Sequence, residues 1–332
     1  MTSGYCFYPA DNHQLDNHPE HPSRFSLIEL PADDEIVSIP FTKARINEVK
    51  RVHTDKILER LEQAALSGGG IIDSAPTYVT PASYEDALTA AGAALAATRA
   101  VVKGTHENSF AIIRPPGHHA EPGRSMGFCL LNNAAIACLD AIESGVERAA
   151  IVDIDAHHGN GTEQCFLNNP RAAYFSTHQE NIYPGSGGMF SIPHAKGRIG
   201  NFPLAEYSGD ICFDQIIQQA LTPFLDTFRP GLILVSIGFD AHHSDPLTSL
   251  GLSTRGYFSI CRQLVNLAME LCDGKIVFIL EGGYLPKNAA NGVKAVFNAM
   301  TGKEMDPVDD LSKFKEPDIN SRINAFRTWD GL

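Results

Sequence analysis

The feature that most constrains the fold is a series of short apolar runs that alternate with helical stretches. The clearest runs are Ser109–Ile113, Ala149–Ile154, Ala172–Ser176, Leu232–Gly238 and Ile276–Leu280. Largely apolar runs of this length, rich in Val and Ile, are typical of strands buried on both faces of a parallel sheet. Because helical stretches separate them, the sequence predicts βαβ units, which means an α/β fold with helices on both faces of a parallel sheet.

The chain around these strands is expected to be helical, with one long irregular stretch. Helices are expected from about residue 26, and over about 83–103, 131–144, 162–167, 212–228, 254–272 and 289–300. Ser83 is a candidate N-cap, because a serine hydroxyl can accept a backbone N–H at a helix start. Residues 178–210 are rich in Gly, Pro and Ser, which predicts a long surface loop of a kind that is usually functional. No linker or internal repeat divides the chain, so one domain is expected over residues 1–332.

Charge and cysteine usage narrow the class of protein. The net charge of −13 argues against nucleic acid as a direct ligand. It suits a cationic partner, such as a Lys-rich tail or a polyamine, although an acidic surface can also serve solubility alone. The seven cysteines are scattered without a C-x-x-C pair, so neither a disulfide framework nor a cysteine zinc site is expected. The longest largely apolar run, 231–239, is too short to span a bilayer, and no signal peptide is evident, so a cytoplasmic setting without a membrane is expected.

Polar motifs follow four of the apolar runs. In chain order they are Arg114-Pro-Pro-Gly-His118-His119, Asp153-Ile-Asp155-Ala-His157-His158-Gly-Asn160-Gly, Gly238-Phe-Asp240 and Glu281-Gly-Gly-Tyr284. The loops after the carboxyl ends of parallel strands are where α/β proteins place their active sites. We therefore expect the four motifs to form one site.

A metal site is expected where Asp155, His157 and Asp240 converge. Two carboxylates and one imidazole make a plausible zinc triad that leaves a coordination position open, as catalytic sites do. An Asp-x-His pair alone is more often structural. With Asp240 after a second strand and a His pair after a third, chance becomes a poor explanation.

The tandem histidines His118 and His119 are candidates for proton transfer, since an imidazole has a pKa of about 6.5. Each needs an orienting partner, and Asp153 and Asn160 are available in the metal loop. Asp153 would raise the pKa of its histidine, whereas Asn160 would hold its partner with little effect of charge. Tyr284, after two glycines, could bring a phenol donor to a substrate carbonyl. Together these groups predict a metal-dependent amide hydrolase.

These motifs, with M-G-F-C and G-F-D-x-x-x-x-D-P, jointly resemble the zinc-dependent histone deacetylase family of the arginase/deacetylase fold. The resemblance extends from His18 to about Tyr284 and includes the family's bacterial histone deacetylase-like amidohydrolases. Asn160, where some members carry Asp, is similar to the class II branch. The resemblance implies about eight parallel strands and hydrolysis of N6-acetyl-lysine or another N6-acyl-lysine.

The resemblance also implies roles for individual residues. It implies zinc bound by Asp155, His157 and Asp240, with His118, His119 and Tyr284 beside the reacting carbonyl. It implies a structural potassium ion held by Asp153, Asp155, His157, Ser176 and Thr177. It implies a tunnel for the acyl-lysine side chain, lined by Gly127, Phe128, Tyr183 and Gly283. It also implies a channel for the released product at Arg24.

Three alternatives stay open at this point. The first is an acetylpolyamine amidohydrolase; Leu247 favours acyl-lysine over it, because polyamine-selective relatives can carry an acidic residue there. The second, an arginase-like two-manganese enzyme, needs more bridging carboxylates than the motifs supply. The third is a non-catalytic acyl-lysine binder. The sequence leaves open the oligomeric state and the roles of Asp73, His242 and His243, which could lie at the tunnel mouth.

Overall fold

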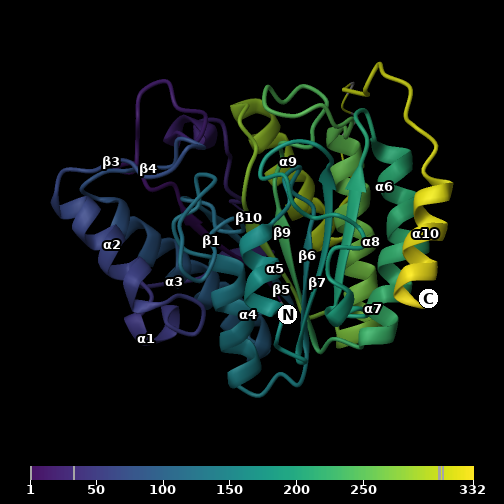
Figure 1. The fold of residues 1–332 in the computed structure, drawn as a ribbon, viewed down its shortest axis with the longest axis horizontal. Coiled ribbons are helices and arrows are strands. Elements are labelled where there is room, and N and C mark those ends of the chain that lie inside the picture. Colours follow the sequence, from purple (N-terminus) through teal and green to yellow (C-terminus); the bar gives the residue numbers. More distant parts are fainter. Residues whose placement is uncertain (1, 33, 306–307, 309) are drawn as a thin grey trace.

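The computed structural model describes residues 2–32, 34–305, 308 and 310–332. Its centre is an eight-stranded sheet in the order β2-β1-β5-β10-β9-β6-β7-β8, in which every neighbouring pair is parallel (Figure 1). The strands are β1 Ser3–Tyr8, β2 Ile36–Ser38, β5 Asn108–Ile113, β6 Ala149–Asp153, β7 Ala172–Gln179, β8 Ile199–Leu204, β9 Leu232–Ile237 and β10 Ile276–Leu280. A small antiparallel pair, β3 Gly70–Ile71 and β4 Tyr78–Val79, lies outside this sheet.

Helices cover both faces of the sheet (Figure 1). They are α1 Ile46–Val49, α2 Asp55–Leu66, α3 Ser83–Val102, α4 Asn133–Glu143, α5 Asn160–Phe166, α6 Asp210–Ile216, α7 Thr222–Phe228, α8 Thr254–Cys272, α9 Pro286–Thr301 and α10 Asn320–Asp330. Short 3-10 turns span Pro22–Phe25 and Pro193–Ala195. No helix in the described part of the chain combines the length and apolar character that crossing a bilayer requires.

Side chains that alternate between the two faces of each strand divide the core into two layers. In β5, Phe110 and Ile112 face the core shared with α6 to α10, whereas Ala111 and Ile113 face the core shared with α2, α3 and α4. Successive residues of a strand point to opposite faces, so an apolar strand contributes side chains to both layers. This is why the strands carry continuous apolar runs, and it confirms the predicted α/β sheet.

Some local expectations are wrong. No helix follows residue 26; residues 26–32 are irregular, and Pro31 disfavours helical geometry at the residue before it. The predicted loop 178–210 contains the strand β8. Gly200 and Pro203 made this segment look irregular in the sequence. Proline is tolerated there because β8 lies at the edge of the sheet. Ser83 opens α3, but the capping position falls on Ala82.

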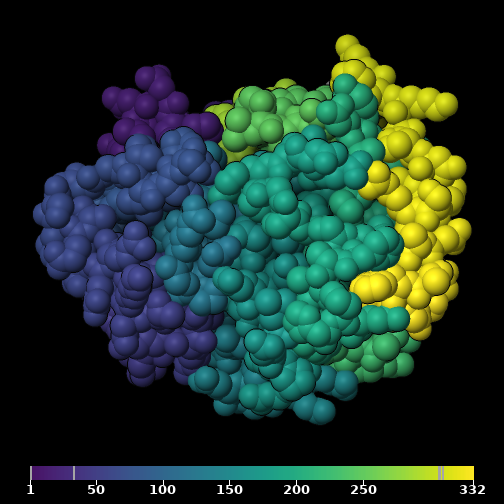
Figure 2. Space-filling model, viewed as in Figure 1, coloured from purple at the N-terminus to yellow at the C-terminus, as the bar shows by residue number. Residues whose placement is uncertain are grey.

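The helix expected over 212–228 forms as one continuous helical stretch with a defect in the middle. A π-helical turn, Ile217–Leu221, joins α6 to α7 directly before Pro223. Proline lacks the N–H that an α-helix would use, so a local change of hydrogen bonding there has a clear cause. The C-terminal helix α10, yellow at one side of Figures 1 and 2, was not expected; its buried Phe326 packs on Phe175 of β7 and Phe202 of β8.

Candidate active site

The four polar motifs follow four strands that are contiguous in the sheet. In the order β5-β10-β9-β6, the carboxyl ends of these strands lead into the segments that begin at Arg114, Glu281, Gly238 and Ile154. The structure thus brings the motifs together at one edge, as the sequence predicts. The site is built from the centre of the sheet, where every strand has a neighbour on both sides.

Asp155, His157 and Asp240 converge in the buried floor of this site. His157 Nδ1 lies 3.2 Å from Asp155 Oδ1 and 2.9 Å from Asp240 Oδ2. Backbone N–H groups hold the carboxylates: Ala156 donates to Asp240 Oδ1, and Gly282 donates to Asp155 Oδ2. One ligand atom from each of the three residues lies within 4.8 Å of the others.

The donor set fits a divalent cation. Asp155 and Asp240 are 1% and 0% exposed, so two carboxylates share a dehydrated space. Burial, followed by the charge of Asp155, raises the pKa of Asp240. Burial opposes ionisation of Asp155 as well, but His118 and His157 outweigh it and lower the pKa of Asp155. Two carboxylates in such a space ionise together only where positive charge neutralises them, and a His/Asp/Asp set is one that zinc accepts.

His118 pairs with Asp153 at 3.1 Å, between His118 Nδ1 and Asp153 Oδ2. Burial alone lowers the pKa of His118, but the carboxylates of Asp155 and Asp153 outweigh it and raise the pKa to about 10. Tyr174 also donates to Asp153 Oδ2, at 2.9 Å, which fixes the carboxylate. His118 is therefore the more basic histidine of the pair.

His119 pairs instead with Asn160, at 2.9 Å between His119 Nδ1 and Asn160 Oδ1. Its pKa is held well below the ordinary value, first by burial and then by the imidazole of His118. The two rings lie 4.0 Å apart, centroid to centroid. The pairing that the sequence left open is thus settled, and the two surroundings shift the two histidine pKa values in opposite directions.

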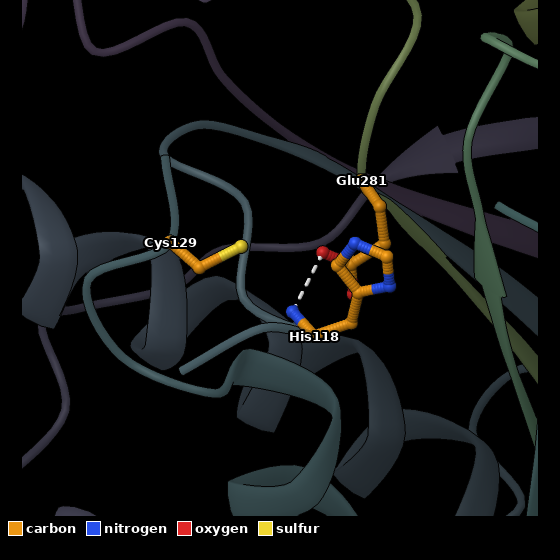
Figure 3. A group of neighbouring side chains, drawn as sticks. All are labelled: His118, Cys129 and Glu281. Carbon is orange, nitrogen blue, oxygen red and sulfur yellow. Dashed lines mark hydrogen bonds between the residues drawn. The ribbon is translucent and has the colours of Figure 1, made fainter. Parts of the chain in front are cut away.

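Glu281 fixes the backbone at the start of the histidine pair, a role that the sequence did not suggest. Its Oε2 accepts the backbone N–H of His118 at 3.1 Å (Figure 3). The same oxygen accepts the N–H of Gly117 at 2.7 Å, and Ser236 donates to Oε1. Cys129 lies beside them, with ligand atoms of His118, Cys129 and Glu281 within 4.8 Å of one another. Burial raises the pKa of the Cys129 thiol well above its ordinary range, and Glu281 already accepts three hydrogen bonds. A structural brace explains this group better than a second metal.

A cavity of about 270 Å³ opens above the metal residues. Its lining consists of Ala75, Pro76, His119, Gly127, Phe128, His157, Tyr183, Leu247 and Tyr284. Gly127 has a φ of +58°, and a Cβ there would stand 2.5 Å from the His119 ring, so glycine allows this wall to approach the histidine. Phe128 faces Tyr284 edge to face at 5.9 Å. Aromatic side chains thus line the cavity beside the imidazoles of His119 and His157.

Tyr284 is held at the side of the floor by two residues. Its backbone N–H donates to Asp245 Oδ2 at 2.9 Å, and the Arg24 guanidinium lies 5.1 Å from its ring centroid. Arg24 also donates to the carbonyls of Gly283 at 2.7 Å and Glu281 at 2.6 Å, which fixes the turn that carries Tyr284. Burial, followed by the charge of Asp240, raises the pKa of the Tyr284 phenol well above its ordinary value, so the group remains a donor.

Comparison with known proteins identifies the family. A histone deacetylase domain model matches residues 18–300. The chain belongs to the histone deacetylase family. A probable deacetylase of Archaeoglobus fulgidus is 38% identical, over 96% of this chain and 90% of its own length. Histone deacetylase 14, chloroplastic, of Arabidopsis thaliana is 37% identical, over 90% of this chain and 77% of its own length.

Further relatives support the family and the fold. A histone deacetylase-like amidohydrolase of Pseudomonas aeruginosa is 35% identical, over 83% of this chain and 74% of its own length. The crystal structure of the HDA15 HD domain matches with a TM-score of 0.89 at 28% identity, over 99% of this chain and 94% of that one. The resemblance deduced from the motifs and the predicted fold are both confirmed.

In this histone deacetylase family member, the residues expected around potassium adjoin one another. Asp153 and Ser176 are partners in register between β6 and β7. The Thr177 hydroxyl lies 3.5 Å from the Asp153 carbonyl. All three residues are buried below the metal loop. Their proximity to one another agrees with the expectation, and the ion itself stays a prediction.

The structure places the residues that the sequence left open. Asp73 lies at the cavity rim, where its carboxylate accepts the N–H groups of Ala75, Thr77 and Gly127. His242 and His243 point away from the cavity: His242 Nε2 lies 3.2 Å from Asp310 Oδ2, and His243 Nε2 lies 2.6 Å from the Asp310 carbonyl. Neither histidine lines the cavity, so their contacts with the C-terminal segment are structural.

Proposed function

We propose that this protein is a zinc-dependent deacylase that hydrolyses the amide of N6-acyl-lysine, most readily N6-acetyl-lysine, to a lysine amine and a carboxylate. The observation that carries the proposal is one cavity whose lining includes His157 of the metal triad, His119 and Tyr284. These are the electrophilic, basic and hydrogen-bonding groups that amide hydrolysis needs, gathered around one point.

Asp155, His157 and Asp240 would hold the zinc ion. When bound there, zinc would act as a Lewis acid on the amide carbonyl and make water a stronger acid. Asp153, Ser176 and Thr177, with Asp155 and His157, would hold potassium as a structural ion. Asp153 would then serve two purposes, because its side chain also orients His118.

The protein's own groups divide the proton transfers. Neutral His119 accepts a proton from the attacking water, because its low pKa leaves it unprotonated at neutral pH. His118, whose pKa is raised, is the group that carries a proton for the leaving amine. The Tyr284 phenol donates a hydrogen bond to the carbonyl oxygen as negative charge develops on it. The acyl carbon thus gains the hydroxyl of water and the leaving amine gains the proton of His118; exchange with solvent then returns His119 to its neutral form and His118 to its protonated form.

The cavity walls favour a lysine stem as the substrate. Phe128 and Tyr183 enclose an unbranched alkyl chain, and Gly127 keeps the wall close to His119. Leu247, 39% exposed at the mouth, offers no charge to the second ammonium of an acetylated polyamine. An acyl-lysine within a peptide is therefore the favoured substrate class, with Arg24 proposed to lie on the route of the carboxylate product.

The test is to compare kcat/KM across acetyl-lysine peptides, longer acyl-lysine peptides and N-acetylated polyamines. We expect acetyl-lysine peptides to be hydrolysed fastest. Removal of metal by a chelator should abolish turnover, and zinc should restore it. Faster hydrolysis of acetylated polyamines than of every acyl-lysine peptide would replace the proposed substrate class, and full activity after complete metal removal would refute zinc dependence.

We also propose that the protein works in the cytoplasm, where its scattered thiols would stay reduced. All seven cysteines are free in the structure. Two relatives are named as chloroplastic, so an organelle is the alternative location to test. Cell fractionation with an antibody to the chain would test the proposal, and recovery in an organelle fraction would refute it.

A further inference from the structure

The Asn160 side-chain amide lies between two hydrogen-bond partners, one of which donates to it and one of which accepts from it. Its oxygen is 2.9 Å from His119 Nδ1, and its nitrogen donates to Glu121 Oε1 at 2.9 Å. The same nitrogen lies 3.5 Å from Met126 Sδ. An asparagine amide has one accepting and one donating end, so reversing it would exchange both contacts.

We propose that Glu121 is a positioning residue that fixes the orientation of the Asn160 amide and, through it, the tautomer of His119. An ionised carboxylate can only accept, so the amide N–H₂ must face Glu121 and the amide oxygen must face His119. His119 Nδ1 then carries the proton that it donates to Asn160. The lone pair stays on His119 Nε2, the nitrogen that can accept a proton from water.

His118 needs no such third residue. Its partner Asp153 accepts through either oxygen, so the His118 tautomer is fixed by the pair alone. Asn160 cannot do this, because its reversed amide would present a donor to His119 and place the lone pair on the wrong ring nitrogen. The catalytic consequence of Glu121 rests on the proposed hydrolysis, whereas the orientation that it imposes does not.

Glu121 is itself held rigidly. Its backbone N–H donates to the Arg124 carbonyl at 2.9 Å in a tight bridge, and its carbonyl lies 3.1 Å from His53 Nδ1. The other nitrogen of His53 accepts the N–H of Asn132 at 2.8 Å, which fixes the His53 proton on the side of Glu121. Burial lowers the pKa of His53 to about 4, so this support does not change around neutral pH.

A glycine lets Glu121 come this close to α5. A Cβ at Gly161 would stand 2.3 Å from the carbonyl oxygen of Ala120. Any side chain there would push the start of α5, which carries Asn160, away from the loop that carries His119 and Glu121. Gly161 therefore allows the contact between Glu121 and Asn160.

Four variants separate orientation from simple charge. Glu121→Leu removes the acceptor and is expected to lower kcat roughly 5- to 10-fold, the effect of losing one hydrogen bond. Glu121→Gln can present either end of its own amide, so it no longer dictates the Asn160 orientation; it should also lower kcat, but by less than Glu121→Leu, because its oxygen can still accept from Asn160. Asn160→Asp places two carboxylates together and should lower kcat by about tenfold. In the double variant that combines Glu121→Gln with Asn160→Asp, the new amide can donate to the new carboxylate, so activity should return to within about threefold of the parent.

Two controls accompany these variants. KM should change little in Glu121→Leu, because the contact lies behind His119 and not along the substrate stem. Glu62→Leu changes an exposed glutamate of α2 in the same way and should leave kcat unaltered. A change in Glu121→Leu that is confined to KM would contradict the proposal.

Nitrogen-15 NMR of the zinc-loaded protein with labelled histidine reads the tautomer without any substrate. The proposal expects the His119 proton on Nδ1 in the parent and a redistribution toward Nε2 in Glu121→Leu. An unchanged His119 tautomer in that variant, or a double variant no more active than Asn160→Asp, would overturn the proposal. If no acyl-lysine is hydrolysed, the proposed function fails, but the NMR result still decides the orientation.

Discussion

The floor of the cavity and its mouth are built by different means. Asp155, His157 and Asp240 on the floor follow central strands, are almost fully buried and are fixed by backbone hydrogen bonds. Leu247 at the mouth comes from a loop and is 39% exposed. A substitution on the floor therefore moves the metal ligands, whereas a substitution at the mouth can change the shape of the entrance without moving the reacting groups. We expect floor substitutions to alter kcat and mouth substitutions to alter substrate choice.

The largest effect is expected from the metal triad. Asp155→Ala or Asp240→Ala should abolish turnover and lower zinc content, because three protein ligands are the minimum for such a site. Metal analysis alongside kcat measures both, with the exposed Asp226→Ala as a matched control. Parent-like rate and zinc content in both floor variants would remove the triad from the mechanism.

The next effect concerns Tyr284. Tyr284→Phe removes one donor to the developing oxyanion, so kcat should fall by about 10²–10³. Zinc content should stay the same, because the phenol is not a ligand in the proposed site. Tyr207→Phe, at an exposed tyrosine, is the control. A near-normal kcat would place Tyr284 with the mouth residues instead of the floor.

The histidine pair should follow. Either His118→Ala or His119→Ala is expected to lower the rate by at least ~10²-fold, the lower range for acid–base catalysis. The pH–rate profile should be bell-shaped, with apparent pKa values that belong to the coupled site. Because the pKa of His119 is lowered, the rate should begin to fall only below pH ~6.5, as His119 gains its proton. Parent activity in both variants would assign proton transfer to other groups.

The smallest effect is expected at the mouth. Leu247→Glu would place a carboxylate near the second ammonium of an acetylated polyamine, a pair that could contribute about 1–3 kcal/mol. This corresponds to roughly 5- to 150-fold in relative kcat/KM toward acetylpolyamines. Activity on a small acetyl-lysine substrate should survive. If that activity is lost with zinc, the mouth and floor are not independent, and the comparison fails.

The sequence predicted the floor better than its surroundings. The central strands carry apolar runs that end in polar motifs, so β5, β6, β9 and β10 and their shared edge could be deduced. The outer strands β1, β2 and β8 could not, because their sequences mix apolar residues with Ser, Gly or Pro. Position in the sheet, rather than local preference, makes them strands.

The supporting contacts of the site were also beyond the sequence. His118 and His119 are adjacent, and nothing in their spacing indicates which pairs with Asp153 and which with Asn160. Glu121 follows one motif and Glu281 begins another, and neither position indicates a contact. In the structure Glu121 contacts the Asn160 amide, and Glu281 contacts the backbone N–H of His118. Such contacts depend on loops that meet only after folding.

The packing of α10 extends the core beyond the part of the chain that the family model matches. The family match ends at residue 300, but Phe326 lies on Phe175 and Phe202, and Arg322 pairs with Glu180. A truncation after residue 300 would keep every proposed catalytic group and uncover an aromatic surface beside the edge strand β8. Exposed aromatic surface next to an unpaired strand edge promotes self-association. The shortened protein is therefore expected to aggregate while its proposed catalytic residues keep their arrangement. Aggregation seen by light scattering or gel filtration would then be a poor guide to whether the active site is intact.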